Sequence, residues 1–119
     1  MIGEYKFMKT DRGGTKFTKI KVDLKTADQW ATEWSVKVYP NDREVLEAGL
    51  NYALKILYKV NKQKYTVTVL DIFISMVDST PDAMFCAAAL VVFKTAGIKN
   101  DQFELVNNNG NWEVIFLES

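Results

Sequence analysis

The residues of this chain that could do chemistry are its carboxylates, because it contains no histidine and one cysteine. Asp71, Asp78 and Asp82 stand around the expected end of a strand and the start of a helix. Three such groups could hold a hard cation or act as an acid–base pair. Carboxylates near a helix N-terminus also stabilise the helix dipole, and capping or solvation is the interpretation we favour. We predict no catalysis, no metal site and no cofactor.

Cys86, the one cysteine, lies in an uninterrupted apolar run. We expect it to be a buried small hydrophobe with a raised pKa. A nucleophile–base triad or a soft-metal site is disfavoured, and an intrachain disulfide is excluded. No glycine-rich phosphate loop precedes a helix, so nucleotide binding is not predicted either.

The charges balance overall but are unevenly distributed. The 119 residues carry 15 basic and 15 acidic side chains, which argues against a general polyanion binder. Residues 1–25 hold seven bases against three acids, whereas residues 101–119 hold four acids and no base. Two oppositely charged patches are therefore expected, and each is a candidate interaction surface.

The basic patch suggests RNA binding by a lysine-rich strand face with aromatic side chains nearby for stacking. Outward lysines also protect strands from edge pairing, so the signal is not specific. The candidate RNA-binding residues are Lys16, Lys19, Lys21 and Lys25, with Phe7, Phe17 or Trp30 for stacking.

The acidic patch and several aromatics suggest a protein interface, since Trp and Tyr are common interface anchors. Tyr52 and Tyr58 lie off the main apolar stripe of their predicted helix. The candidate partner-binding residues are Asp101, Glu104, Trp112, Glu113, Glu118, Tyr52 and Tyr58. Acidic side chains there would suit a basic partner, because complementary charge speeds association.

A buried helix must position these groups. From Ala83 to Phe93 every residue is apolar, so this helix needs cover on nearly all sides. Thr80 can cap its first amides, Pro81 suits the first turn, and Gly97 marks its end. Eleven residues span roughly 16 Å, about half of a hydrocarbon core, so we expect no membrane span.

The remaining pattern predicts an α+β fold in one domain, residues 1–119. Asn41 and Glu44 resemble a capping box, and Leu46, Leu50 and Leu57 share one helical stripe. Asn109-Gly110 predicts a hairpin turn. The expected order is β-β-β-α-β-α-β-β, with strands near 4–9, 16–25, 30–38, 64–76, 102–106 and 112–117 and helices at 42–60 and 80–97. We expect the first three strands to form an antiparallel meander in a mostly antiparallel, five- to six-stranded sheet with two helices on one face.

The segment Val77 to Ala88 resembles the fourth domain of translation elongation factor G. That domain has a valine-aspartate-serine before a helix with paired alanines, and Asp78, Ser79, Ala87 and Ala88 match the spacing. The resemblance covers roughly residues 15–97. It implies a fold shared with a ribosomal-protein domain and several ATPases, with two helices on one side of the sheet and a left-handed crossover.

The resemblance does not carry over the factor's translocation role. The factor's strand-to-helix tip carries a glycine-rich turn and a histidine, whereas here Ser75-Met76 runs almost directly into Val77-Asp78. Fold likeness alone does not assign a function.

Size and character also make the chain similar to the immunity or antitoxin proteins with which bacteria neutralise a toxin domain. We therefore predict a non-enzymatic protein-binding module that occludes a partner, for which a basic toxin domain is one candidate and a second copy another. The alternative is an RNA- or ribosome-associated domain that uses the lysine-rich strand face. The N-terminus lacks a secretion-signal pattern, so a cytoplasmic location is expected.

Overall fold

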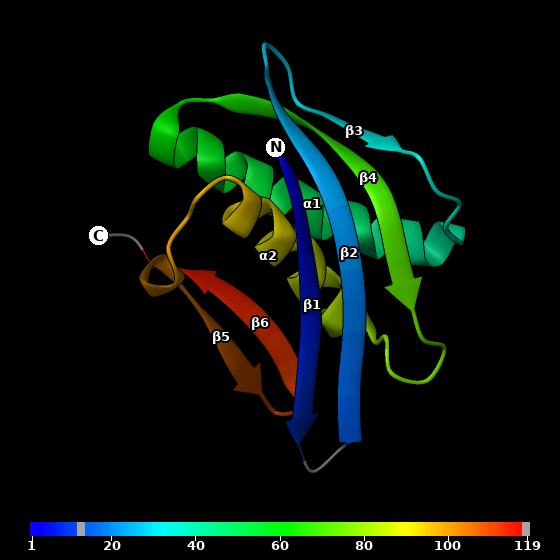
Figure 1. Ribbon diagram of the computed structural model, residues 1–119. Helices are drawn as coiled ribbons and strands as arrows, with labels where there is room; N and C mark the ends of the chain where they lie inside the picture. Colours follow the sequence, from blue (N-terminus) through cyan, green and yellow to red (C-terminus); the bar gives the residue numbers. More distant parts are fainter. Residues whose placement is uncertain (12–13, 118–119) are drawn as a thin grey trace.

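The computed structural model describes residues 1–11 and 14–117, and its elements follow the expected order (Figure 1). The α+β class is confirmed. The elements are β1 (Ile2–Asp11), β2 (Gly14–Ala27), β3 (Ala31–Trp34), α1 (Pro40–Asn61), β4 (Lys64–Ile74), α2 (Pro81–Thr95), the 3₁₀ turn η1 (Asn100–Gln102), β5 (Phe103–Asn108) and β6 (Asn111–Phe116).

The strands form two sheets and not the single sheet that we expected. A four-stranded sheet has the order β1-β2-β4-β3, and β5 pairs only with β6. The predicted meander is wrong, because β3 pairs in parallel with β4 and not with β2. Both edges of β2 are occupied, by β1 and by β4. A parallel neighbour needs a long crossover, and α1 provides it.

Both helices cover one face of the four-stranded sheet, as predicted, and lie behind it in Figure 1. In that view β3 and β4 run toward the lower right, with β4 on the lower-left side of β3. The crossover from β3 through α1 to β4 is therefore left-handed. We call the helix-covered side the closed face and the other side the open face.

The helix α2 is the centre of the core, as the apolar run predicts. Every residue from Ala83 to Phe93 except Phe85 is buried. Its C-terminus is closed by Gly97, which has a φ of 89°, and by a bond of 2.9 Å from the Ile98 amide to the Phe93 carbonyl. Thr80 is the N-cap residue, but its hydroxyl donates to the Asp82 carboxylate and caps no backbone amide.

The predicted stripe of α1 is buried at Leu46, Leu50 and Leu57. The predicted capping box is absent, because the helix begins at Pro40 and its N-cap residue makes no side-chain bond. Proline at the first position fixes a helical φ and needs no amide partner, so the helix starts earlier than expected.

The third strand is shorter than residues 30–38. Ser35 still donates to the Val69 carbonyl at 2.9 Å, and the chain then turns toward Pro40. The predicted hairpin turn is correct: Asn109 and Gly110 both have positive φ, 55° and 92°. No helix among the described residues is long and apolar enough to cross a membrane.

Candidate functional site

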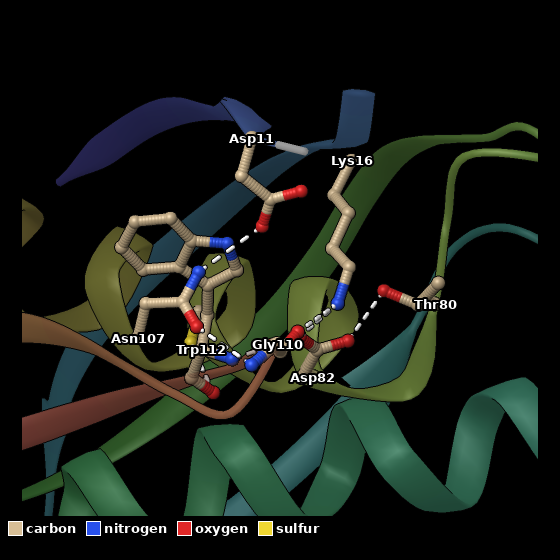
Figure 2. A network of polar contacts seen from close by, with 8 residues as sticks. Asp11, Lys16, Thr80, Asp82, Asn107, Gly110 and Trp112 are labelled. Atoms are coloured by element: carbon tan, nitrogen blue, oxygen red, sulfur yellow. Dashed lines mark hydrogen bonds and ion pairs between the residues drawn. The ribbon is translucent and has the colours of Figure 1, made fainter. Parts of the chain in front are cut away.

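A group of polar contacts joins β2, the start of α2 and the turn of the β5–β6 hairpin (Figure 2). The Lys16 Nζ atom donates to Asp82 Oδ2 at 2.8 Å and to the Gly110 carbonyl at 2.6 Å. The Trp112 amide donates to the same Asp82 oxygen at 2.8 Å. We call Lys16, Asp82, Gly110 and Trp112 the polar clasp.

The polar clasp is mostly shielded from water. The Lys16 and Asp82 side chains are 19% and 12% exposed. Partial burial alone would raise the pKa of Asp82, but hydrogen bonds from Lys16, Thr80 and the Trp112 amide outweigh it and lower that pKa. Each charged group is directed at another group of the protein, so this arrangement holds three elements together.

Cys86 lies one helical turn beyond Asp82 and is buried. Burial raises the pKa of its thiol to about 12, with further contributions from the charges of Asp82 and Glu113. The expected raised pKa is confirmed, and at neutral pH the group remains a neutral thiol.

The three aspartates considered for a cation site do not form one. Asp71 is exposed on β4 and accepts a bond of 2.9 Å from the amide of Ile72, whereas Asp82 belongs to the polar clasp. Within residues 1–11 and 14–117, no group of three or more histidine, cysteine, aspartate or glutamate side chains could hold a metal ion.

The structure separates the predicted partner-binding residues into inward and outward groups. Trp112 packs edge-on against Phe7, with ring centroids 6.1 Å apart. The Tyr52 hydroxyl donates to the Val114 carbonyl at 3.2 Å, and its ring lies 5.6 Å from that of Phe85. Trp112 therefore fastens the hairpin to β1, and Tyr52 joins α1 to the hairpin and to α2.

The acidic residues Asp101, Glu104 and Glu113 are exposed. Register places Glu104 opposite Ile115, and Val106 opposite Glu113. Glu118 lies outside the described residues. We call the exposed acids Glu104 and Glu113, with Asp101 of the preceding turn η1, the acidic surface of the hairpin.

Tyr58 lies elsewhere, near the C-terminus of α1. Its ring packs edge-on against Trp30 with centroids 5.5 Å apart, and the Lys64 ammonium lies 5.6 Å from its centre. It belongs to a small aromatic and basic cluster that is separate from Trp112, which packs on Phe7.

Three of the four predicted RNA-binding lysines share the open face, and the fourth does not. Lys19, Lys21 and Lys25 alternate with the buried residues of β2. Lys16 is an even number of residues from buried Thr18, so it points to the closed face and enters the polar clasp. The alternation of side chains along the strand would have been enough to exclude Lys16 from the lysine-rich face.

Carboxylates stand beside two of the remaining lysines. The Lys19 ammonium lies 3.4 Å from Glu4, and the Lys25 ammonium lies 3.7 Å from Asp23. The open face is thus mixed in charge, not uniformly basic.

A shallow hollow of about 350 Å³ lies on the open face. Phe17 and Phe73 meet there edge-on, with ring centroids 5.5 Å apart, and Phe73 is 57% exposed. The hollow is lined by Glu4, Phe17, Lys19, Ile20, Lys21, Asp71, Ile72 and Phe73. Sequence reasoning missed Phe73, because a strand with apolar residues on both sides predicts burial on both faces.

The loop of residues 75–80, which we call the tip loop, displays apolar side chains to solvent. Met76 is fully exposed and Val77 is 86% exposed. The Ser75 amide donates to Ser79 Oγ at 2.9 Å, and the Ser79 amide donates to the Ser75 carbonyl at 3.0 Å. The loop is therefore closed on itself by hydrogen bonds.

The tip loop is also fastened to β2. The Phe17 amide donates to the Asp78 carbonyl at 2.9 Å, and the Ser79 hydroxyl donates to the Phe17 carbonyl. Met76 and Val77 consequently lie at the same end of the sheet as Phe17 and Phe73. In the sequence, the apolar pair Met76-Val77 between Ser75 and Asp78 could have indicated an exposed loop.

Comparisons with known proteins establish the fold alone. No family model and no curated protein matches the chain. Among solved structures, the chain is similar to the crystal structure of ttk003000868 from Thermus thermophilus, with a TM-score of 0.66 and 16% sequence identity. The likeness covers 96% of this chain and 23% of the other, so the chain spans about a quarter of that protein's length.

Proposed function

We propose that this chain is a non-enzymatic, immunity-like protein-binding module that acts by covering a surface of its partner, and that the tip loop is its main anchor. The observation that carries the proposal is the exposure of Met76 and Val77 on a loop closed by hydrogen bonds. Exposed apolar groups of this kind mark interaction surfaces.

The rigidity of the tip loop favours binding. Association normally costs conformational entropy when a loop becomes ordered, and a loop already held by its own bonds avoids most of that cost. Ser75 Oγ also accepts the amides of Val77 and Asp78, each at 3.3 Å. The two apolar side chains are thus presented on a backbone that needs no rearrangement.

The acidic surface of the hairpin has a secondary role in this proposal. Glu104, Glu113 and Asp101 are exposed, and no ion pair among the described residues occupies them. Such charges would steer a basic partner, a toxin domain being one example, and contribute mainly to the rate of association.

RNA or ribosome association is the second candidate, because the Phe17–Phe73 pair lines the same hollow as Lys19 and Lys21, with Phe73 directly opposite Lys19. Exposed aromatics on a sheet can stack bases while lysines hold phosphates. We also infer that the resemblance to the fourth domain of elongation factor G reflects a shared fold. The mixed charge of the open face makes this candidate weaker than protein binding.

The test is affinity capture from the cytosol of the source organism at moderate salt, with and without nuclease, followed by titration of the purified partner. The test variant is Met76→Ser with Val77→Ser. Its matched control is Ile115→Ser, which removes an exposed apolar group from the hairpin. We expect a stoichiometric, nuclease-resistant protein partner whose affinity falls at least tenfold with the tip-loop variant and stays unchanged with the control.

Other outcomes separate the alternatives. Loss of the partner with Glu104→Gln and Glu113→Gln, but not with the tip-loop variant, would move the site to the hairpin. Loss of all bound material after nuclease, together with loss on Lys19→Glu and Lys21→Glu, would favour RNA, whose binding should also fall steeply with salt. A chain that retains no partner would contradict the proposed function.

A further inference from the structure

The outer edge of β1 pairs with no other strand of the described structure from Ile2 to Met8. The strand stands at the end of the four-stranded sheet and pairs only with β2. It runs for ten residues without a proline or a bulge. Long edges without a proline or a bulge accept further strands, and the charged side chains on such an edge decide which strands fit.

The hydrogen-bond pattern shows which backbone groups face that edge. Met1 and Leu24 exchange both backbone bonds, at 2.7 and 2.8 Å. Bonded pairs alternate along an antiparallel ladder, so Gly3, Tyr5 and Phe7 also direct their groups toward β2. The amides and carbonyls of the even-numbered residues, from Ile2 to Met8, therefore point outward and are free to bond another strand.

The side chains of those even-numbered residues lie on the open face, with two apolar residues at the ends and two opposite charges between them. Ile2 and Met8 are 66% and 55% exposed, and between them stand Glu4 and Lys6. Lys6 lies directly opposite Lys19 and makes no ion pair within the described residues. Like charges that face each other across two strands repel and destabilise the ladder. An acidic group on the other side of Lys6 would offset the repulsion between Lys6 and Lys19.

We propose that a partner protein adds one antiparallel strand to the free edge of β1, and that this strand carries apolar, acidic, basic and apolar residues at alternate positions. In that register the apolar residues lie opposite Met8 and Ile2, the acid opposite Lys6 and the base opposite Glu4. The backbone bonds supply affinity, and the alternate side chains supply specificity.

The same pattern is complementary to itself, so a second copy is the competing occupant. It would place Ile2 against Met8 and Glu4 against Lys6 of the other chain. Figure 1, however, shows β5 and β6 projecting past β1 on the helix side. Two-fold pairing would bring the two projecting hairpins toward the same space, whereas a single added strand lies in the plane of the sheet, in front of the hairpin.

This inference deepens the proposed function, on which it rests, by naming how a partner's backbone is held. Its test needs only the purified chain, so its failure leaves capture through the tip loop standing. The probe is the peptide TVTETKTVT, and the control is TVTKTETVT, which has the same composition but places lysine opposite Lys6. Hydrogen exchange of single amides reports binding.

We expect the first peptide to slow exchange at Glu4, Lys6 and Met8 at least fivefold and to leave Gly3, Tyr5 and Phe7 unchanged, because those amides already bond β2. The control peptide should need at least a fivefold higher concentration. The double variant Glu4→Lys with Lys6→Glu should reverse the preference between the two peptides.

Three results would overturn the proposal. The first is protection without alternation along β1, and the second is equal binding of both peptides by the parent chain. The third is protection of the even-numbered amides in the absence of peptide that becomes stronger as the protein concentration rises. This result would identify a second copy as the occupant.

Discussion

The two faces of the four-stranded sheet use neighbouring residues of the same strands for opposite purposes. On the closed face, Phe7, Ile20 and Val69 are completely buried under α1 and α2. On the open face, Met8 and Phe73 remain more than half exposed. Stability therefore resides on one face, and side chains of the other can change with little energetic cost. The open face and the tip loop are the surface available for recognition.

The largest effect should come from a charge placed inside the closed side. Ala88→Asp buries an unpaired carboxylate in α2 and should unfold the protein, a loss of more than about 4 kcal/mol. Lys94→Asp, at the exposed end of the same helix, should be tolerated far better. Circular dichroism with thermal melting checks both, and an Ala88→Asp variant that melts like the parent would refute the buried helix.

Two adjacent residues of β1 test the contrast between the faces most directly. Phe7→Ala should cost about 3–5 kcal/mol, because it leaves a cavity against Trp112 and α2. Met8→Ala, on the open face, should change stability by no more than about 0.5 kcal/mol. Urea unfolding of the two variants gives both numbers, and equal losses would mean that the open face is covered.

The crossing of α1 and α2 permits a test that adds a side-chain atom instead of removing some. A Cβ added at Gly49 would lie 2.5 Å from the Phe85 carbonyl oxygen and 2.9 Å from the Ala88 Cβ. Gly49→Ala should therefore destabilise by about 1–3 kcal/mol, although alanine is the better helix former. At an open helical site alanine would stabilise, so a gain in the denaturation midpoint would show that the helices are not this close.

The last of these tests concerns the polar clasp at the border of the closed side. Asp82→Asn should cost about 1–3 kcal/mol at neutral pH, because Lys16 and the Trp112 amide lose a charged acceptor. The folded-state pKa of Asp82 is lowered, so its contribution is complete above the unfolded pKa of about 3.9 and is lost as pH falls through the folded pKa.

The difference in stability between parent and Asp82→Asn should accordingly be constant from about pH 6 to 8 and shrink below about pH 4. Urea midpoints measured across that range check it. Asp101→Asn, which changes an exposed carboxylate outside the polar clasp, serves as the control. A difference between parent and Asp82→Asn that grew on acidification would contradict the assignment of the polar clasp.

Features that depend on short stretches of sequence could be predicted from the sequence alone. The uninterrupted apolar run requires burial of α2, the leucine spacing specifies the buried stripe of α1, and Asn109-Gly110 specifies a turn with two positive φ angles. The thiol of Cys86 could likewise be placed in the core. Each follows from short-range periodicity or backbone preference, which the chain carries without reference to distant partners.

Which elements lie together depends instead on long-range packing. The pairing of β3 with β4 depends on where the crossover helix packs, and nothing in residues 31–34 encodes that position. Trp112 and Tyr52 look like surface anchors in the sequence, but Trp112 packs on Phe7 and the Tyr52 hydroxyl donates to the Val114 carbonyl of the hairpin. Lys16 acquires its role only because the Asp82 carboxylate, 66 residues away, comes within 2.8 Å. The same packing that sets these contacts leaves Met76 and Val77 without cover, since no element of the described chain folds over the tip loop.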